Sequence, residues 1–249
     1  MRALLLPLCL AVAAAAAAPA YKGFVYASFS RGGFSSNASD ASLDDVAATR
    51  VEVIELMATY YVANSVNATA IAPSAYSPSD ADVLHAVAAA RARGLRVAFK
   101  PHVDCLDGVW RAFIGTGFTT AAQWADWFSN YTAFLLHFAG LARSAGGDLV
   151  GFNVGTELDG THAHAAEWRA VIDAVRGALP GVPLWLGPNW NWKGAPGYTL
   201  VSFWDALDYL GVDMCARAAA RAAPRTRRPR ARIWARHVRA QVRATRDAQ

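Results

Sequence analysis

Glutamate is scarce in this sequence of 249 residues: the chain has only four, and none follows Glu167. Chemistry that needs a carboxylate beyond that point must therefore use aspartate. Cysteine is scarce as well, with three in all. Cys9 lies in the N-terminal apolar run, so only Cys105 and Cys215 remain to form one bridge, and a disulfide framework is excluded.

Glycine-rich phosphate loops are absent. No G-x-G-x-x-G or P-loop pattern follows a predicted strand, which argues against a nucleotide-binding open sheet. The histidines also lack the spacing of metal ligands, including His162 and His164. We therefore expect neither a metal nor an organic cofactor.

Acidic residues are nearly missing from the C-terminal segment. Residues 216–249 contain eleven arginines and one aspartate, and 24 of these 34 residues are Arg, Ala or Pro, whereas residues 1–215 carry a net charge of −5. A stretch built from residues with GC-rich codons indicates intron read-through or a shifted frame, and predicts a disordered or helical tail. The alternative is a basic arm, because Trp234, Val238 and Val242 would share one helical face.

The N-terminus has the pattern of a secretory signal. Residues 1–20 have a charged start, an apolar centre and small residues at the end. The mature chain would begin near Tyr21 and be secreted without a membrane segment. The apolar run of the signal is shorter than the roughly 20 residues that a membrane-spanning helix needs. The alternative is that the run stays uncleaved as an anchor. Sequons at Asn37 and Asn67 are expected to carry glycans, whereas a third, at Asn130, lies in a predicted helix.

The body, residues 21–215, alternates strand-like and helix-like segments, the pattern of a parallel sheet with crossover helices. Helices are expected from Ser77 to Gly94, from Thr120 to Gly146 and from about Ala163 toward Gly181. The pattern predicts an α/β fold, a (β/α)8 TIM-type barrel of which about six units are present, because complete barrels need about 250 residues. The competing fold is an open doubly wound sheet. The strand candidates are Gly23–Phe29, Val51–Met57, Leu95–Pro101, Leu149–Gly155, Val182–Leu186 and Leu207–Asp213.

Polar and aromatic side chains gather at the predicted strand ends, which in a barrel open at one mouth. Glu157 follows the fourth strand, where barrel enzymes place catalytic groups. Indoles together with carboxylates, an amide and a lysine are typical of a sugar site, because sugar rings stack on tryptophan and hydroxyls need paired hydrogen-bond partners. The binding candidates are Tyr60 with its neighbour Tyr61, Lys100, His102, Asp104, Trp110, Arg111, Asn189, Trp190 and Asp213.

These candidates also have structural interpretations. The glutamate could be a buried acid paired with Lys100 or Arg111, and His102 could be a satisfied core residue. The tryptophans after the fifth strand, Trp190 and Trp192, are not at helical spacing. At least one of them is therefore expected to be a platform for a sugar ring.

Ten short segments, spread over about residues 22–215, match the motifs of one family in the same order. They are Lys22-Gly-Phe, Met57–Tyr61, Gly94–Asp104, Trp110-Arg111, Trp124–Phe128, Gly155–Leu158, Glu167–Arg169, Asn189-Trp190, Phe203–Asp205 and Tyr209–Asp213. They resemble glycoside hydrolase family 113. The resemblance implies a (β/α)8 barrel, a retaining mechanism and β-mannanase activity.

By this resemblance Glu157 is the general acid/base, which protonates the glycosidic oxygen and then activates water. The nucleophile would be a glutamate ending a seventh strand, but the only acid after Asp213 is Asp247. A retaining enzyme needs its two carboxyl groups about 5–5.5 Å apart. Asp213 could replace the nucleophile only in an inverting geometry, with the carboxyl groups about 6.5–9.5 Å apart.

We therefore expect a secreted β-mannanase-like hydrolase that acts on β-linked polysaccharide and is inactive as written. One alternative is a secreted carbohydrate-binding pseudoenzyme, and another is an interaction protein that uses its basic tail. Polysaccharide is the expected partner; nucleic acid is not expected for a secreted protein. A barrel without two units would also expose strand edges, so aggregation is expected.

Overall fold

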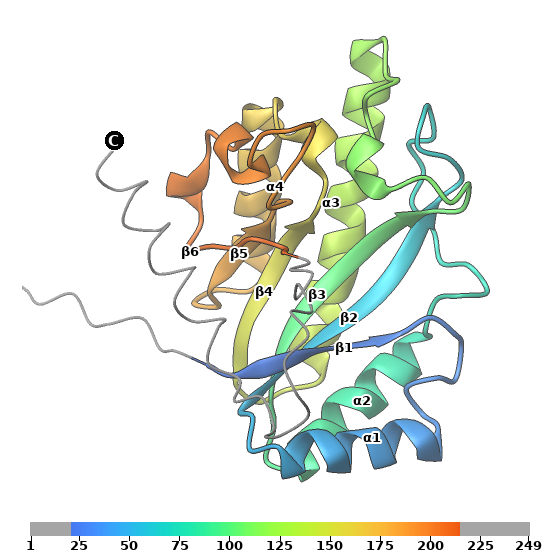
Figure 1. The fold of residues 1–249 in the computed structure, drawn as a ribbon, viewed down its shortest axis with the longest axis vertical. Helices are drawn as coiled ribbons and strands as arrows, with labels where there is room; N and C mark the ends of the chain where they lie inside the picture. Colours follow the sequence, from blue (N-terminus) through green and yellow to red (C-terminus); the bar gives the residue numbers. More distant parts are fainter. Residues whose placement is uncertain (1–20, 215–249) are drawn as a thin grey trace, which may run out of the picture.

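The computed structural model describes residues 21–214, and the predicted signal and basic tail lie outside the described residues. Six parallel strands form one sheet in sequence order, as Figure 1 shows, and the two outermost strands are not paired with each other within the described part. The predicted α/β fold with six successive parallel strands is confirmed. The strands are β1 (Gly23–Ser28), β2 (Val53–Val62), β3 (Arg96–Cys105), β4 (Leu149–Thr156), β5 (Leu184–Gly187) and β6 (Tyr209–Leu210).

Four α-helices connect the first five strands. Helix α2 contacts β2 and β3, α3 contacts β3, and α4 contacts β4 and α3, so these helices cover the sheet on its outer face. Figure 1 shows α1 and α2 side by side near β1. From β5 to β6 the chain forms only short 3-10 turns, at Gly197–Leu200 and Trp204–Ala206. The helices are α1 (Asn37–Ala48), α2 (Asp80–Ala92), α3 (Ala121–Ser144) and α4 (Ala165–Ala178).

Side-chain caps set the starts of three helices, among them α1, where the Ser36 hydroxyl accepts from the Ser39 amide. Ser79 and Asp82 form a reciprocal capping box at α2, and Thr120 and Gln123 form one at α3, which satisfies amide groups that have no partner inside the helix. Helix α1 was not predicted from the sequence. Only Leu43 among its residues is buried, so the helix lacks the apolar periodicity on which such a prediction depends.

Two strands are longer than predicted, which decides where their side chains point. Strand β3 continues to Cys105 and β2 continues to Val62, so His102 and Asp104 lie within a strand and not after it. Because side chains alternate along a strand, Lys100, His102 and Asp104 share the inner face of the sheet. The intervening side chains of β3 pack toward the helices, where Phe99 stacks on Phe152 of β4.

The core between sheet and helices is aromatic and tightly packed. The Tyr131 hydroxyl of α3 donates a hydrogen bond of 2.8 Å to the carbonyl of Val154. A Cβ at Gly155 would lie 2.8 Å from the Trp168 ring of α4, so the glycine lets this helix approach β4 closely. No helix within residues 21–214 is long and apolar enough to cross a membrane.

Candidate active site

Glu157 stands at the turn that follows β4, with an unusual backbone conformation. Its φ is 52°, a left-handed value that, within residues 21–214, only Arg50 and Lys193 share among residues other than glycine. Its amide donates to the Gly187 carbonyl at 2.8 Å, which extends the β4–β5 ladder by one bond. Such strained positions cost about 1–3 kcal/mol each and concentrate at functional sites.

The Glu157 side chain is held by two donors from the loop after β3. Its Oε2 atom accepts hydrogen bonds from Trp110 Nε1 at 2.8 Å and from Arg111 Nη1 at 2.5 Å. Arg111 also places Nη2 3.5 Å from Asp104 Oδ2. We name Asp104, Trp110, Arg111 and Glu157 the Arg111 cluster. The Glu157 side chain remains 16% exposed, so the predicted arginine contact exists but does not seal the carboxylate from solvent.

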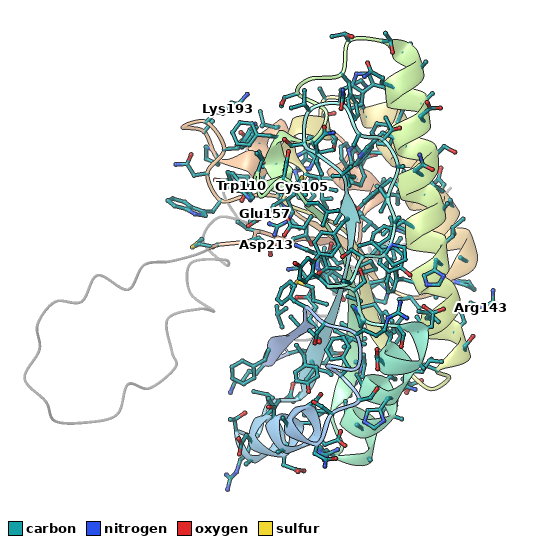
Figure 2. All side chains as sticks on the ribbon, turned by 90° about the vertical axis from the view of Figure 1, so that its right-hand side faces the viewer. Cys105, Trp110, Arg143, Glu157, Lys193 and Asp213 are labelled. Carbon is teal, nitrogen blue, oxygen red and sulfur yellow. The ribbon has the colours of Figure 1, made fainter. Side chains whose placement is uncertain are left out.

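A second charged group lies on the same inner face of the sheet. Lys100 Nζ lies 3.1 Å from both carboxylate oxygens of Asp213 and 3.6 Å from Glu55 Oε2. Burial would lower the pKa of Lys100, but the two carboxylates together raise it above its usual value. Burial raises the pKa of Glu55, and Lys100 offsets this only in part. We name these three residues the Lys100 cluster; Figure 2 shows Trp110, Glu157 and Asp213 near one another.

His102 lies on β3 between Lys100 and the residues of the Arg111 cluster. It is 3% exposed, and its Nδ1 atom has no hydrogen-bond partner among the described residues. Burial lowers the pKa of His102 well below its usual value, and the charges of Arg111 and Lys100 lower it further. The imidazole is therefore neutral at physiological pH.

The loop between β5 and β6 is fixed to the turn that carries Glu157. Buried Asn189 donates from Nδ2 to Asp159 Oδ2 at 2.5 Å, and from its amide to the same carboxylate at 3.3 Å. Burial raises the pKa of Asp159 despite these bonds. Trp192 packs edge-to-face on Trp110 at 5.6 Å and on Phe113 at 4.9 Å between ring centroids. The loops after β3 and β5 therefore meet next to Glu157.

The structure brings most of the predicted site residues together. Tyr60 lies apart from them, because it occupies the outer face of β2 and packs on Phe134 and Phe138 of α3. Its neighbour Tyr61 points to the inner face. Burial raises the pKa of Tyr61, and the charge of Asp104 raises it further. The residues gathered at or beneath the mouth are Lys100, His102, Trp110, Arg111, Glu157, Asn189 and Asp213. Trp190 lies on the loop next to them, where its amide donates to the Asp213 carbonyl.

Two acidic residues of this region were missed by sequence reasoning. Glu55 is a charged residue in the middle of an otherwise apolar strand, and that contrast was a usable signal. Asp159 follows Glu157 by two residues but has no comparable signal, because its partner Asn189 is distant in sequence. Within residues 21–214, no group of three or more His, Cys, Asp or Glu side chains is arranged to hold a metal ion.

The geometry is suited to proton transfer at a partly open carboxylate. An indole N–H and a guanidinium fix the orientation of Glu157, and a 39% exposed Trp110 ring lies beside it. A positioned carboxyl group of this kind can give a proton to a leaving oxygen and later take one from water. Asp213, the acid that the sequence offered as a second reacting group, is bound by Lys100.

Comparisons with known proteins agree with this geometry. The model of Glycoside Hydrolase Family 113 matches residues 23–237. A solved GH113 beta-1,4-mannanase has 24% identity and a TM-score of 0.67, over 76% of this chain and 60% of that one. The GH113 beta-mannanase AaManA from Alicyclobacillus acidocaldarius, in complex with ManMIm, has 27% identity and a TM-score of 0.66, over 76% and 59%.

The chain thus spans about 60% of the length of these solved structures. No curated protein matches it. The family match nevertheless covers far more than half of the 249 residues and includes the whole sheet, the Arg111 cluster and the Lys100 cluster. The chain belongs to glycoside hydrolase family 113.

Proposed function

We propose that this chain binds β-1,4-linked mannan across the mouth at the ends of β3, β4 and β5, with Glu157 as the proton donor. The observation that carries the proposal is the hydrogen-bonded and partly open Glu157 carboxylate at the end of β4. Barrel enzymes place their reacting groups at this end of the strands. Mannan is proposed because the two similar solved proteins are named as mannanases.

In the proposed reaction Glu157 protonates the glycosidic oxygen as the bond to the sugar breaks. Trp110 and Arg111 both bind Oε2 of Glu157, which leaves Oε1 to carry the proton. A retaining mechanism needs a second carboxylate on the other side of the anomeric carbon, which forms a covalent bond to the sugar before water releases it. The chain contains no glutamate after Glu167, so we propose that as written it does not complete hydrolysis.

The two acids of the Lys100 cluster support this view. Asp213 has both carboxylate oxygens 3.1 Å from Lys100, and Glu55 lies deeper, against the same ammonium group. An acid used as a nucleophile must be free to approach the anomeric carbon. Both acids would first have to break their contact with Lys100.

Binding and hydrolysis of mannohexaose by the full chain test the proposal. We expect calorimetry to detect binding, and product analysis to detect no cleavage. Binding should persist in Glu157→Gln, because the amide keeps the shape and can still accept from Trp110. Cleavage of mannohexaose at the same rate by the full chain and by Glu157→Gln would show that Glu157 is not the acid.

A carbohydrate-binding pseudoenzyme is the second candidate function. The observation that favours it is the Lys100 contact to Asp213 together with the absence of a later glutamate. Both functions predict mannan binding without hydrolysis. They differ in whether the proton on Glu157 can still reach a leaving oxygen when an external nucleophile replaces the missing carboxylate.

We also propose that the protein is secreted and glycosylated at Asn37 and Asn67, both of which are exposed. Residues 1–20 supply the signal pattern. Asn67 is exposed, whereas the Asn130 amide donates to the Thr69 carbonyl at 3.1 Å and is held in the folded protein. When the full chain is expressed in a eukaryotic secretory host, the culture medium should contain a protein whose N-terminus lies near Tyr21. A glycosidase that removes N-glycans should reduce its mass, and Asn37→Gln and Asn67→Gln should each abolish part of that change.

A further inference from the structure

A separate hollow lies beside the Glu157 mouth, on the loop between β5 and β6. Its volume is about 300 Å³, at the lower end of the range typical of small-ligand sites. None of its lining residues belongs to the Arg111 cluster or the Lys100 cluster. They are Trp190, Asn191, Pro196, Tyr198, Val212 and Met214, together with two small residues of the same loop.

The two tryptophans of this loop have different surroundings. Trp192 is 7% exposed and is occupied by its contacts with Trp110 and Phe113. Trp190 is 48% exposed, and within residues 21–214 its ring pairs with no other aromatic ring. An exposed indole that lines a hollow presents a flat apolar face to a ligand.

The backbone that carries Trp190 is fixed on both sides. The Trp190 amide donates to the Asp213 carbonyl at 3.1 Å, and the Gly197 amide donates to the Asn189 carbonyl at 2.9 Å. A Cβ at Gly197 would overlap the Asp159 carboxylate and lie 2.5 Å from the Asn189 carbonyl. The loop that forms the hollow is therefore held by hydrogen bonds at both ends. A ligand would not have to order this loop on binding.

The lining chemistry indicates a neutral ligand. No residue with a charged side chain lines the hollow. Asn191 uses Oδ1 to accept from the Gly194 amide at 3.0 Å, while its Nδ2 atom and the Tyr198 hydroxyl make no hydrogen bond to another described residue. An indole face with an amide donor and a phenol at its side fits a sugar ring, which has apolar faces and hydroxyl edges.

The hollow is also adjacent to the proposed reaction centre. The Glu157 amide is bonded to the Gly187 carbonyl, and Trp190 follows that residue by three positions. Glu157 and the hollow therefore both lie at the C-terminal ends of the neighbouring strands β4 and β5. We propose that this Trp190 hollow binds one neutral sugar ring of a polysaccharide whose scissile bond lies at Glu157. This inference rests on the proposed function and extends it to longer chains.

Titration of the full chain with mannobiose and with mannohexaose tests the inference. For Trp190→Ala we expect affinity for mannohexaose to fall about tenfold, the effect of a lost contact of about 1.4 kcal/mol. Affinity for mannobiose should stay within twofold, because a short ligand can occupy the Glu157 mouth alone. Trp190→Phe, which keeps a ring, should lose no more than threefold for mannohexaose.

Phe24→Ala is the matched control, since Phe24 is 49% exposed but lies on β1 outside the hollow. It should change neither affinity. If Trp190→Ala remains folded by circular dichroism and binds mannohexaose as tightly as the parent, the inference is overturned while the proposed function stands. If the folded parent binds neither sugar, the proposed function fails and this inference fails with it.

Discussion

The Arg111 cluster and the Lys100 cluster have the same arrangement of charges but different surroundings. Each places one cation between two carboxylates, Arg111 between Asp104 and Glu157, and Lys100 between Glu55 and Asp213. The Lys100 side chain is 7% exposed, and the group links strands β2 and β3 to the segment after β6. The Arg111 cluster includes an exposed indole and lies at the strand ends. Lys100 is the more buried cation, since Arg111 is 17% exposed, but the carboxylates Glu55 (21%) and Asp213 (26%) are more exposed than Glu157 (16%). The comparison teaches that the Lys100 cluster joins three segments of the sheet, whereas the Arg111 cluster presents an exposed indole to a ligand.

The largest expected effect comes from removing the deeper cation. Lys100→Met would leave Glu55 and Asp213 without their shared partner, and breaking a buried pair costs about 3–5 kcal/mol. We expect a decrease of that size in the free energy of unfolding, measured by urea denaturation at pH 7. Lys22→Met, at an exposed lysine, should change it by less than about 0.5 kcal/mol.

A second substitution separates charge from packing in this prediction. Glu55→Gln in the Lys100→Met background removes one of the two uncompensated carboxylates, so part of the lost stability should return. If the Lys100→Met variant loses less than about 1 kcal/mol, the carboxylates are solvated. The distinction between a structural and a ligand-accessible cluster would then be broken.

His102 lies between the clusters and reports on both through pH. Its pKa in the folded protein is lowered, so below about pH 6.5 the unfolded state binds a proton that the folded state does not. The free energy of unfolding should therefore decrease as pH falls, by up to about 1.4 kcal/mol per pH unit from this residue. His102→Gln should reduce that slope in urea denaturation measured from pH 7 to pH 5.

His162 provides the comparison for the charge effect. Burial alone lowers its pKa, to about 3, and it packs near Trp168 and Phe203. Arg111→Met should therefore raise the pKa of His102, measured by NMR titration of the imidazole protons, and leave that of His162 unchanged. Equal shifts in both histidines would indicate a general loosening of the core.

The smallest effect is expected at the proposed proton donor. Glu157→Gln keeps the shape of the side chain, and Arg111 retains its contact with Asp104. The neutral amide oxygen can still accept hydrogen bonds from Trp110 and Arg111, so the free energy of unfolding should change by no more than about 1 kcal/mol. A loss as large as that of Lys100→Met would identify Glu157 as a structural residue and remove the contrast between the clusters.

Much of the fold followed from local patterns. The apolar runs predicted six strands in order, and the predicted helix starts at Ser77 and Thr120 lie two residues before the N-cap of α2 and at the N-cap of α3. Helix α1 could not be found in this way, because its buried contact is a single leucine, Leu43. Its stability depends on packing with α2, which is a tertiary effect.

The sequence predicted a site residue correctly where the end of a strand alone determines the position of its side chain. Glu157 is such a residue, and the loop pair Trp110-Arg111 follows the same rule. Tyr60 shows the limit: β2 extends five residues beyond its predicted end, so alternation and not strand termination decides which side Tyr60 faces. The Asp159 contact with Asn189 depends on two loops that meet only in the folded protein.

The central proposal is that Glu157 can deliver a proton to a glycosidic oxygen although no glutamate follows Glu167 to act as the nucleophile. Azide supplied to the full chain with mannohexaose tests this most directly. Azide would form a bond to the anomeric carbon as the C–O bond breaks, and the leaving oxygen would take the proton of Glu157, which water restores. We predict a mannosyl azide product with the parent chain and none with Glu157→Gln; equal product from both would contradict the account.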